Sequence, residues 1–188
     1  MKLLKNLKPI KGDASFRSFY RKKTKNLSSI IVYAKKDKKS NLLIYDSINK
    51  ILLKNNIIAP KLINENYLKN LIEIQDFGNQ TIFNLLKKRN EDRLFIFKKI
   101  INLLKKMQLI KDKKIINFKN QNYRVPKYTN KILFEEAKLF STWYVPQKIS
   151  KRNHLKFSKD YERLIKILIK KISFKNDVFV HRDFHVSN

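Results

Sequence analysis

The first pattern of polar and apolar positions along the chain is that of two short strands. Aromatic and polar residues alternate over 16–20, and a β-branched run occupies 30–33. A polar connection, 21–26, lies between them. Because alternation with a period of two is typical of strands, this part of the chain is predicted to form a β-hairpin.

A helical period follows the hairpin. Apolar residues recur at three- and four-residue intervals over 41–54, with Ser40 or Asn41 available as N-cap and Ala59-Pro60 as the end of the segment. We expect one helix there. A looser alternation over 68–77 then predicts another strand.

The second part of the chain has mainly a helical period. Apolar spacing predicts two helices between 80 and 107, and further helices over 132–144 and 160–172. A polar loop is predicted over 111–130, and the apolar run 178–180 has the composition of a strand. A strand-rich part followed by a helix-rich part predicts an α+β fold.

Composition indicates a packed core. Of the 188 residues, 43% are hydrophobic, which is too many for a disordered polycation. Cysteine is absent, so disulfides, thiolate metal sites and cysteine nucleophiles are excluded. No apolar run reaches the roughly 18 residues that a membrane span needs, and lysines interrupt the amino terminus too often for a signal peptide. We therefore expect a cytoplasmic protein without a membrane span.

The charge allows two interpretations. The chain carries 44 lysines and arginines against 15 acidic residues, a net charge of +29. Because such a field attracts polyanions, a lysine-rich nucleic-acid-binding protein without catalysis is one hypothesis. However, only 8 of the cations are arginine, which bidentate phosphate and base recognition favour, and the 36 lysines are spread along the whole chain. The alternative is a solvated surface with weak, non-specific affinity for polyanions.

The strongest chemical signal lies in the last eight residues. His181-Arg182-Asp183 and Asn188 match the H-R-D-x-x-x-x-N pattern of kinase catalytic loops at every fixed position. In phosphoryl transfer, the aspartate accepts or orients the proton of the attacking hydroxyl, and the asparagine holds a magnesium ion against the nucleotide. His181 is expected to brace the backbone. His185 either reaches the phosphates or the substrate, or is simply packed.

Two further segments fit nucleotide binding. One follows the predicted sheet, where backbone groups can meet the edge of an adenine; it consists of Glu73, Ile74, Gln75 and Asp76. The other precedes the first strand, where a turn can aim backbone N–H groups and a hydroxyl at phosphate; it consists of Gly12, Asp13, Ala14 and Ser15. For this second segment, a plain surface turn is an equal alternative.

These landmarks occur in the order found in a known family. The segments 12–21, 76–81, 136–144 and 180–183, together with Asn188, resemble successive motifs of the aminoglycoside-phosphotransferase-like kinases. Within this family they are most similar to the bacterial N-acetylmuramate/N-acetylglucosamine anomeric kinases of cell-wall recycling. The resemblance covers the whole chain, and the ordered set is much more specific than any one motif.

The resemblance implies a protein-kinase-like, two-lobed fold that uses ATP and Mg²⁺. The γ-phosphoryl group would pass to a hydroxyl of a small molecule, with an amino sugar as the favoured substrate. Residues 1–77 would form the nucleotide-binding lobe, and residues 78–188 a partial helical lobe that ends at the catalytic loop. We expect a monomer.

The resemblance also assigns roles. Asp183 would be the base and Asn188 a magnesium ligand, while residues 12–15 would be the phosphate loop and residues 73–76 the adenine hinge. A further group would lie near the acceptor sugar, although helix packing is an equal role for its aromatic members; it consists of Glu136, Trp143 and Tyr144.

The sequence departs from the family pattern in two places. Protein kinases carry a phosphate-gripping lysine on the third strand, whereas here Tyr33-Ala34 occupies that place and Lys35 or Lys36 follows. Family members also continue past the catalytic loop to a second magnesium-binding aspartate, so we expect these residues to be a truncated piece with little activity alone. An aminoglycoside or choline-like acceptor is the alternative within the same fold, and the segment 136–144 favours the sugar.

Overall fold

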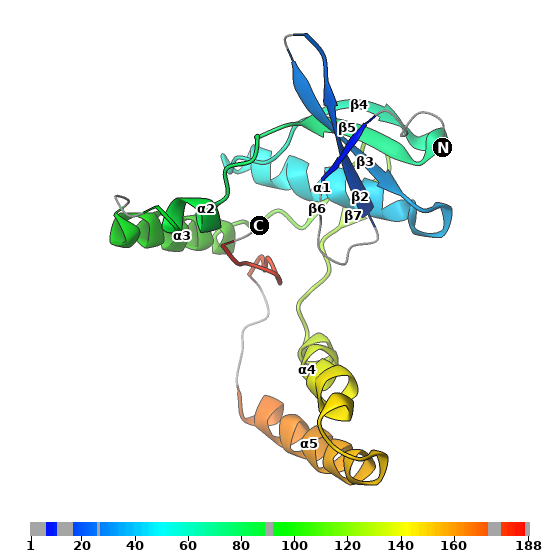
Figure 1. Ribbon diagram of the computed structural model, residues 1–188, viewed down its shortest axis with the longest axis vertical. Coiled ribbons are helices and arrows are strands. Elements are labelled where there is room, and N and C mark those ends of the chain that lie inside the picture. The colour runs from blue at the N-terminus through cyan, green and yellow to red at the C-terminus, as the bar shows by residue number, and fades with distance from the viewer. Residues whose placement is uncertain (1–6, 11–16, 26, 89–91, 173–177, 187–188) are drawn as a thin grey trace. The chain divides into compact units, whose positions relative to one another are not determined.

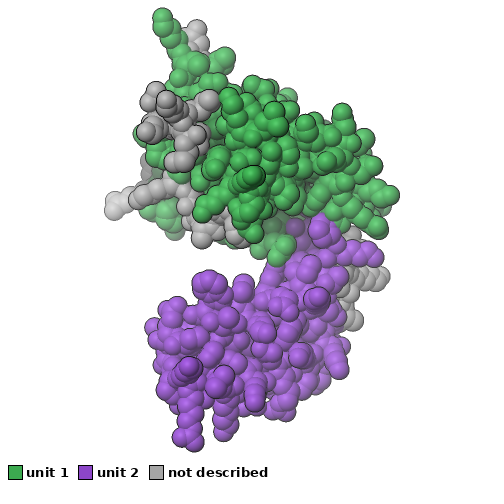
Figure 2. Space-filling model, turned by 90° about the vertical axis from the view of Figure 1, so that its right-hand side faces the viewer, with its two compact units in different colours: residues 1–125, 181–188 green, residues 126–180 purple. Residues whose placement is uncertain are grey.

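The structure is a computed structural model, and the chain in it forms two compact units (Figure 2). The first unit combines residues 1–125 with 181–188, and the second consists of residues 126–180. The predicted lobes 1–77 and 78–188 are a different division and stay a prediction. The residues that the structure describes are 7–10, 17–25, 27–88, 92–172 and 178–186.

A five-stranded antiparallel sheet forms the centre of the first unit (Figure 1). Its strands lie in the order β1-β2-β3-β5-β4. The predicted hairpin is confirmed as β2 and β3, with Arg17 opposite Ala34 at one end and Lys23 opposite Ser28 at the other. The strand bounds are Lys8–Ile10 (β1), Arg17–Lys23 (β2), Ser28–Ala34 (β3), Leu62–Asn66 (β4) and Leu71–Gln75 (β5).

Helix α1 (Ser40–Lys54) covers one face of this sheet (Figure 1). Alternation along β3 and β5 sends every second side chain to that face, where an apolar cluster forms. Burial of each large aliphatic side chain contributes roughly 1.5–3 kcal/mol, so this cluster holds the helix on the sheet. Its buried members are Ile30, Val32, Ala34, Leu42, Ile72 and Ile74.

The ends of α1 differ from the prediction. Neither Ser40 nor Asn41 is the N-cap, because Lys39 holds that position and makes no side-chain capping bond. A 3₁₀ turn over Lys36–Lys38 leads directly into the helix and takes the place of a cap. The helix ends at Lys54, well before Ala59-Pro60, because Asn56 adopts a left-handed conformation with φ 55°.

The two predicted helices after residue 80 are confirmed as α2 (Ile82–Leu86) and α3 (Arg93–Gln108). The predicted polar loop over 111–130 contains a short hairpin, formed by β6 (Lys114–Ile116) and β7 (Asn122–Arg124). Each of these strands has only three residues, which is too short to show a period of two.

The second unit is helical, as predicted, although its boundaries differ. α5 begins before residue 160, because the Ser150 hydroxyl caps it by accepting a hydrogen bond from the Asn153 amide at 3.4 Å. α4 passes into a π-helical turn and then a 3₁₀ turn. The bounds are Asn130–Leu139 (α4), Phe140–Tyr144 (π turn), Val145–Gln147 (3₁₀ turn) and Lys151–Lys171 (α5).

Polar contacts and rings join α4 to α5 within this unit. The Tyr161 hydroxyl donates to the Ala137 carbonyl at 3.0 Å, and His154 Nε2 lies 2.7 Å from the Ser141 carbonyl oxygen. The rings of Phe140 and Tyr161 lie 5.5 Å apart between centroids. Phe140, which lies within the segment 136–144, therefore takes part in the packing of α5.

The strand predicted over residues 178–180 does not form. A strand needs a neighbour that pairs with its backbone groups, and no described segment pairs with this run. Apolar composition alone was therefore a misleading signal. No described helix combines the length and apolar character that crossing a bilayer requires.

Candidate active site

Strand β5 carries Glu73 into a polar contact that crosses three strands. Lys22 of β2 and Ser29 of β3 donate hydrogen bonds to its Oε1 at 3.0 and 2.5 Å. Burial alone would raise the pKa of Glu73, but the hydrogen bonds from Ser29 and Lys22 outweigh burial and hold that pKa below its ordinary value. By alternation these side chains lie on the face of the sheet away from α1. They brace the strand that leads into the predicted hinge.

Asp76 fixes the turn that follows β5. Arg21 Nε lies 2.7 Å from its Oδ2, and Arg21 Nη2 donates to its Oδ1 at 3.0 Å. The Ser28 hydroxyl and the Gly78 amide donate to the same carboxylate at 2.5 and 2.8 Å. Burial would raise the pKa of Asp76, but these partners together hold it below its ordinary value.

The backbone of the turn is held as well. Arg21 Nη2 donates to the Gly78 carbonyl at 3.0 Å, and its Nη1 donates to the side chain of Asn79 at 2.5 Å. Gly78 adopts φ 80°, in the left-handed region that favours glycine. Arg21 thus connects β2 to Asp76, Gly78 and Asn79, and these contacts fix the direction in which the chain leaves β5.

Of the four predicted hinge residues, Glu73, Ile74 and Gln75 lie in β5, and Asp76 follows the strand. Ile74 belongs to the buried cluster, and the Gln75 amide donates to the Lys61 carbonyl at 2.9 Å. The side chains of Glu73 and Asp76 are engaged in the contacts above. The adenine-hinge role of 73–76 stays a prediction. Strand pairing occupies backbone groups up to Gln75, so the backbone that follows Gln75 is the part of this segment best placed to meet an adenine.

The predicted catalytic loop belongs to the same compact unit as the sheet. The Phe83 amide of α2 donates to the Val186 carbonyl at 2.8 Å, which ties the loop to the helix that follows the turn. Arg182 adopts φ 70°, whereas the other described non-glycine residues with positive φ are asparagines. This conformation costs an arginine roughly 1–2 kcal/mol. Such strain is typical of functional loops, because the surrounding structure must hold it in place.

The side chains of the loop are arranged around Asp183. Its carboxylate is exposed, and His185 Nε2 lies 3.6 Å from its Oδ1. His181 packs edge-on against Phe184, with the ring centroids 5.3 Å apart, and its bracing of the backbone stays a prediction. The sequence left the direction of His185 open, and the structure places this ring beside the predicted base.

An apolar cavity of about 390 Å³ adjoins the loop. Side chains of α1, α2 and α3 line it together with Phe184 and Val186 of the loop. Its walls are mainly aliphatic and aromatic, and His181 and His185 of the loop line it as well. Sequence analysis missed this cavity, since its walls come from segments far apart in the chain.

The predicted phosphate loop, residues 12–15, and the predicted magnesium ligand Asn188 lie outside the described residues. Within the described ranges, no group of three or more His, Cys, Asp or Glu side chains could hold a metal ion. Proteins usually hold Mg²⁺ with one or two carboxylates and the substrate's phosphates. Because the expected ligand Asn188 lies outside the described residues, the magnesium assignment stays a prediction.

The predicted acceptor residues lie in the second unit. Glu136 of α4 accepts a hydrogen bond from the Tyr128 hydroxyl. Tyr144 stacks on Phe140 with centroids 5.4 Å apart, while the Trp143 ring is largely exposed. Tyr144 therefore packs within its own turn while remaining about half exposed, and Trp143 is the most exposed aromatic side chain of the segment 136–144.

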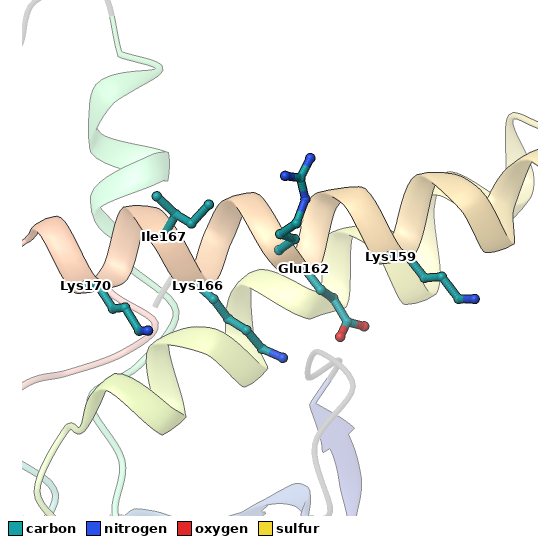
Figure 3. Close-up of a pocket in the computed structure, with 6 residues that line it drawn as sticks. Lys159, Glu162, Lys166, Ile167 and Lys170 are labelled. Atoms are coloured by element: carbon teal, nitrogen blue, oxygen red, sulfur yellow. The ribbon is translucent and has the colours of Figure 1, made fainter.

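A basic hollow of about 390 Å³ lies along α5 in the same unit (Figure 3). The Lys138 ammonium lies 3.3 Å from the carboxylate of Glu162, the acidic residue of its lining, so the hollow keeps an excess of positive charge. Such a surface attracts anions. Sequence analysis did not single it out, although the basic residues recur at three- and four-residue intervals. The lining consists of Lys159, Glu162, Arg163, Lys166, Ile167 and Lys170.

Comparison with known proteins gives relatives of low identity. The chain is 25% identical over 177 residues to an N-acetylmuramate/N-acetylglucosamine kinase of Pseudomonas putida. The matched region covers 94% of the chain and 49% of that kinase. It is 22% identical over 180 residues to a Pseudomonas aeruginosa protein of the same name, with 96% and 50% covered. The chain thus spans about half the length of these curated relatives.

A solved structure shares the fold. It is the crystal structure of a spectinomycin phosphotransferase in complex with ADP and spectinomycin. The match covers 100% of the present chain and 62% of the phosphotransferase chain, with a TM-score of 0.54 and 18% sequence identity. No family model matches the sequence. The fold is therefore α+β and protein-kinase-like. The similarity to the two sugar kinases agrees with the resemblance of the sequence to the aminoglycoside-phosphotransferase-like kinases.

Proposed function

We propose that the protein is an ATP-dependent phosphotransferase that transfers a γ-phosphoryl group to a hydroxyl of a small molecule. The observation that carries the proposal is the loop around Asp183. Its carboxylate is exposed, it follows a strained Arg182, and the loop is tied to α2 through Val186. The kinase and phosphotransferase names of the relatives support the same activity.

The proposed chemistry rests on the Asp183 carboxylate. It accepts or orients the proton of the acceptor hydroxyl, whose oxygen attacks the γ-phosphorus as the bond to the ADP leaving oxygen breaks. The His185 ring lies beside this carboxylate, with its Nε2 3.6 Å from the Asp183 Oδ1. The adenine would lie against the turn that Asp76 and Arg21 hold, and ADP in the structural neighbour supports nucleotide binding. Mg²⁺, with Asn188 as its expected ligand, would neutralise negative charge on the nucleotide's phosphates.

The proposed acceptor is an amino sugar, phosphorylated at its anomeric hydroxyl as a step of cell-wall recycling in the cytoplasm, by a monomeric enzyme. The curated relatives support it, since both are named N-acetylmuramate/N-acetylglucosamine kinases. A second candidate is an aminoglycoside, because the structural neighbour holds spectinomycin. Residues 136–144 favour the sugar by their resemblance to the sugar kinases.

Phosphoryl transfer tests the proposal directly. Protein from the complete reading frame is incubated with ATP, Mg²⁺ and one acceptor at a time, and the phosphorylated product is measured by mass spectrometry. N-acetylmuramate and N-acetylglucosamine should be phosphorylated, and spectinomycin should not. Asp183→Asn should lose roughly a hundredfold or more in turnover, the scale of general base catalysis.

A matched variant controls for the change of charge. Asp160→Asn removes an exposed carboxylate of α5 and should keep wild-type turnover. If spectinomycin is phosphorylated and neither sugar is, the acceptor is an aminoglycoside and the proposed amino sugar is wrong. If no acceptor is phosphorylated, or if Asp183→Asn turns over as fast as the wild type, the proposed function is wrong.

A further inference from the structure

Strand β3 supplies no cation to the face of the sheet that α1 covers. β3 sends Ser28, Ile30, Val32 and Ala34 to that face, and the last three of these side chains are buried and apolar. Lys35 and Lys36 follow the strand and are exposed. A kinase fold needs a positive charge near the nucleotide's β- and γ-phosphates, and the third strand is its usual source. In this chain the charge must come from another element.

The neighbouring strand places a cation at the required end. Arg17, the first residue of β2, lies directly opposite Ala34 in the antiparallel register. By alternation its side chain shares a face with Phe19, which packs against the buried cluster. The register therefore brings an arginine beside the position where β3 has only a methyl group.

The guanidinium of Arg17 is held in place by aromatic rings. Its Cζ lies 4.9 Å from the ring centroid of Tyr45 on α1 and 6.0 Å from that of Phe19. Burial lowers the pKa of Arg17 while Tyr45 acts in the opposite direction, and an arginine remains charged near neutral pH in any case. A half-buried, oriented guanidinium can bind phosphate oxygens as a fork and loses less freedom than a mobile lysine.

The position along the sheet also fits. Arg17 begins β2 just after the connection from β1, whereas the Asp76 turn lies at the other end of the ladder, beyond the Ser29–Gln75 pair. The Arg17–Ala34 pair and the Ser29–Gln75 pair are five residues apart along β3, which corresponds to a distance of roughly 17 Å. This separation is comparable with the length of an extended nucleoside triphosphate.

Two further basic side chains of β2 form ion pairs that hold the sheet and the turn after β5. Arg21 is paired with Asp76, and Lys22 with Glu73. We propose that Arg17 is the cation that contacts the nucleotide's phosphates and takes the place of the third-strand lysine. This inference rests on the proposed function, because it presumes that the sheet binds ATP.

Calorimetric titration of the full chain with ATP and with adenosine tests the inference. Arg17→Gln should weaken ATP binding on the order of tenfold to a hundredfold, the scale of a lost charge-assisted hydrogen bond, and leave adenosine binding unchanged. Arg17→Lys should fall between the two, since it keeps the charge without the fork. Lys23→Gln, at the far end of the same face of β2, should bind ATP like the wild type.

The outcomes separate the two proposals. If the wild type binds ATP and Arg17→Gln binds it equally well, or if the loss appears in Lys35→Gln or Lys36→Gln instead, the assignment of Arg17 is wrong and ATP use stands. Equal losses for ATP and adenosine in both Arg17 variants would show a structural role and overturn the assignment. A wild type that binds neither ligand overturns ATP use, and the assignment with it.

Discussion

Replacing Asp76 by asparagine tests the turn that connects the sheet to the rest of the chain. Asp76 and Arg21 have side chains only 5% and 12% exposed, so they form a buried ion pair. Asparagine keeps the shape and part of the hydrogen bonding but removes the charge opposite Arg21. Breaking a buried pair on one side costs about 3–5 kcal/mol, and the retained hydrogen bonds favour the lower end, about 3 kcal/mol.

That loss is large against the whole stability of a domain, about 5–15 kcal/mol. It should appear as a lower free energy of unfolding in urea at pH 7, measured by circular dichroism. Asp37→Asn is the matched control, because its carboxylate is 68% exposed and lies 3.9 Å from Lys38. An exposed pair of this kind contributes about 0–1 kcal/mol, so this variant should remain close to the wild type.

The pH dependence gives the same test a second readout. The pKa of Asp76 is lower in the folded protein than its ordinary value, so its stabilising contribution is fully present above about pH 4 and is lost as the pH falls through the folded value. The wild type should therefore lose more stability than Asp76→Asn between pH 7 and pH 3. A variant within about 0.5 kcal/mol of the wild type at pH 7, the usual range of surface substitutions, would refute the buried pair.

Two further predictions concern the turn and the basic hollow. Gly78→Ala should lower the free energy of unfolding by about 1–2 kcal/mol, because the backbone angle φ of 80° is strained for any residue with a Cβ. The added Cβ itself meets no atom within 4 Å, so the loss comes from the backbone alone. A variant as stable in urea as the wild type would contradict this. Replacing three lysines of α5 by glutamine should weaken heparin binding and flatten the salt dependence of that binding. If replacing three exposed lysines of α3 weakens heparin binding equally, only the net charge matters and the hollow is not a binding site. The two sets are Lys159, Lys166 and Lys170, and Lys98, Lys99 and Lys105.

Local periodicity was sufficient for the elements that bury one face. The β2–β3 hairpin, α1 and the pair α2–α3 were predicted because their apolar residues recur at a strand or helix period. The hairpin β6–β7 was missed because its strands are too short to show a period. The first part of α5 was missed because Lys151 to Lys159 is dominated by polar residues, and its start depends on a cap at Ser150.

The site divides in the same way. The loop around Asp183 could be singled out because the residues of its motif lie close together in the sequence. The pairing of Arg21 with Asp76 could not, since the two residues are 55 positions apart and meet only through the strand register. The same holds for Arg17 and Ala34, whose contact depends on how β2 lies beside β3. Register is a property of the assembled sheet, so sequence motifs alone leave such partners unassigned.

Titration of ¹⁵N-labelled protein with ADP, followed by NMR, tests most directly whether the sheet is a nucleotide site. If the sheet binds the nucleotide, the amide signals that shift will be those of the turn at Asp76–Gly78 and of the Arg17 end of β2. Signals of α5 should stay in place. Shifts confined to the basic hollow of α5, with the turn unperturbed, would contradict a kinase and support a polyanion-binding protein instead.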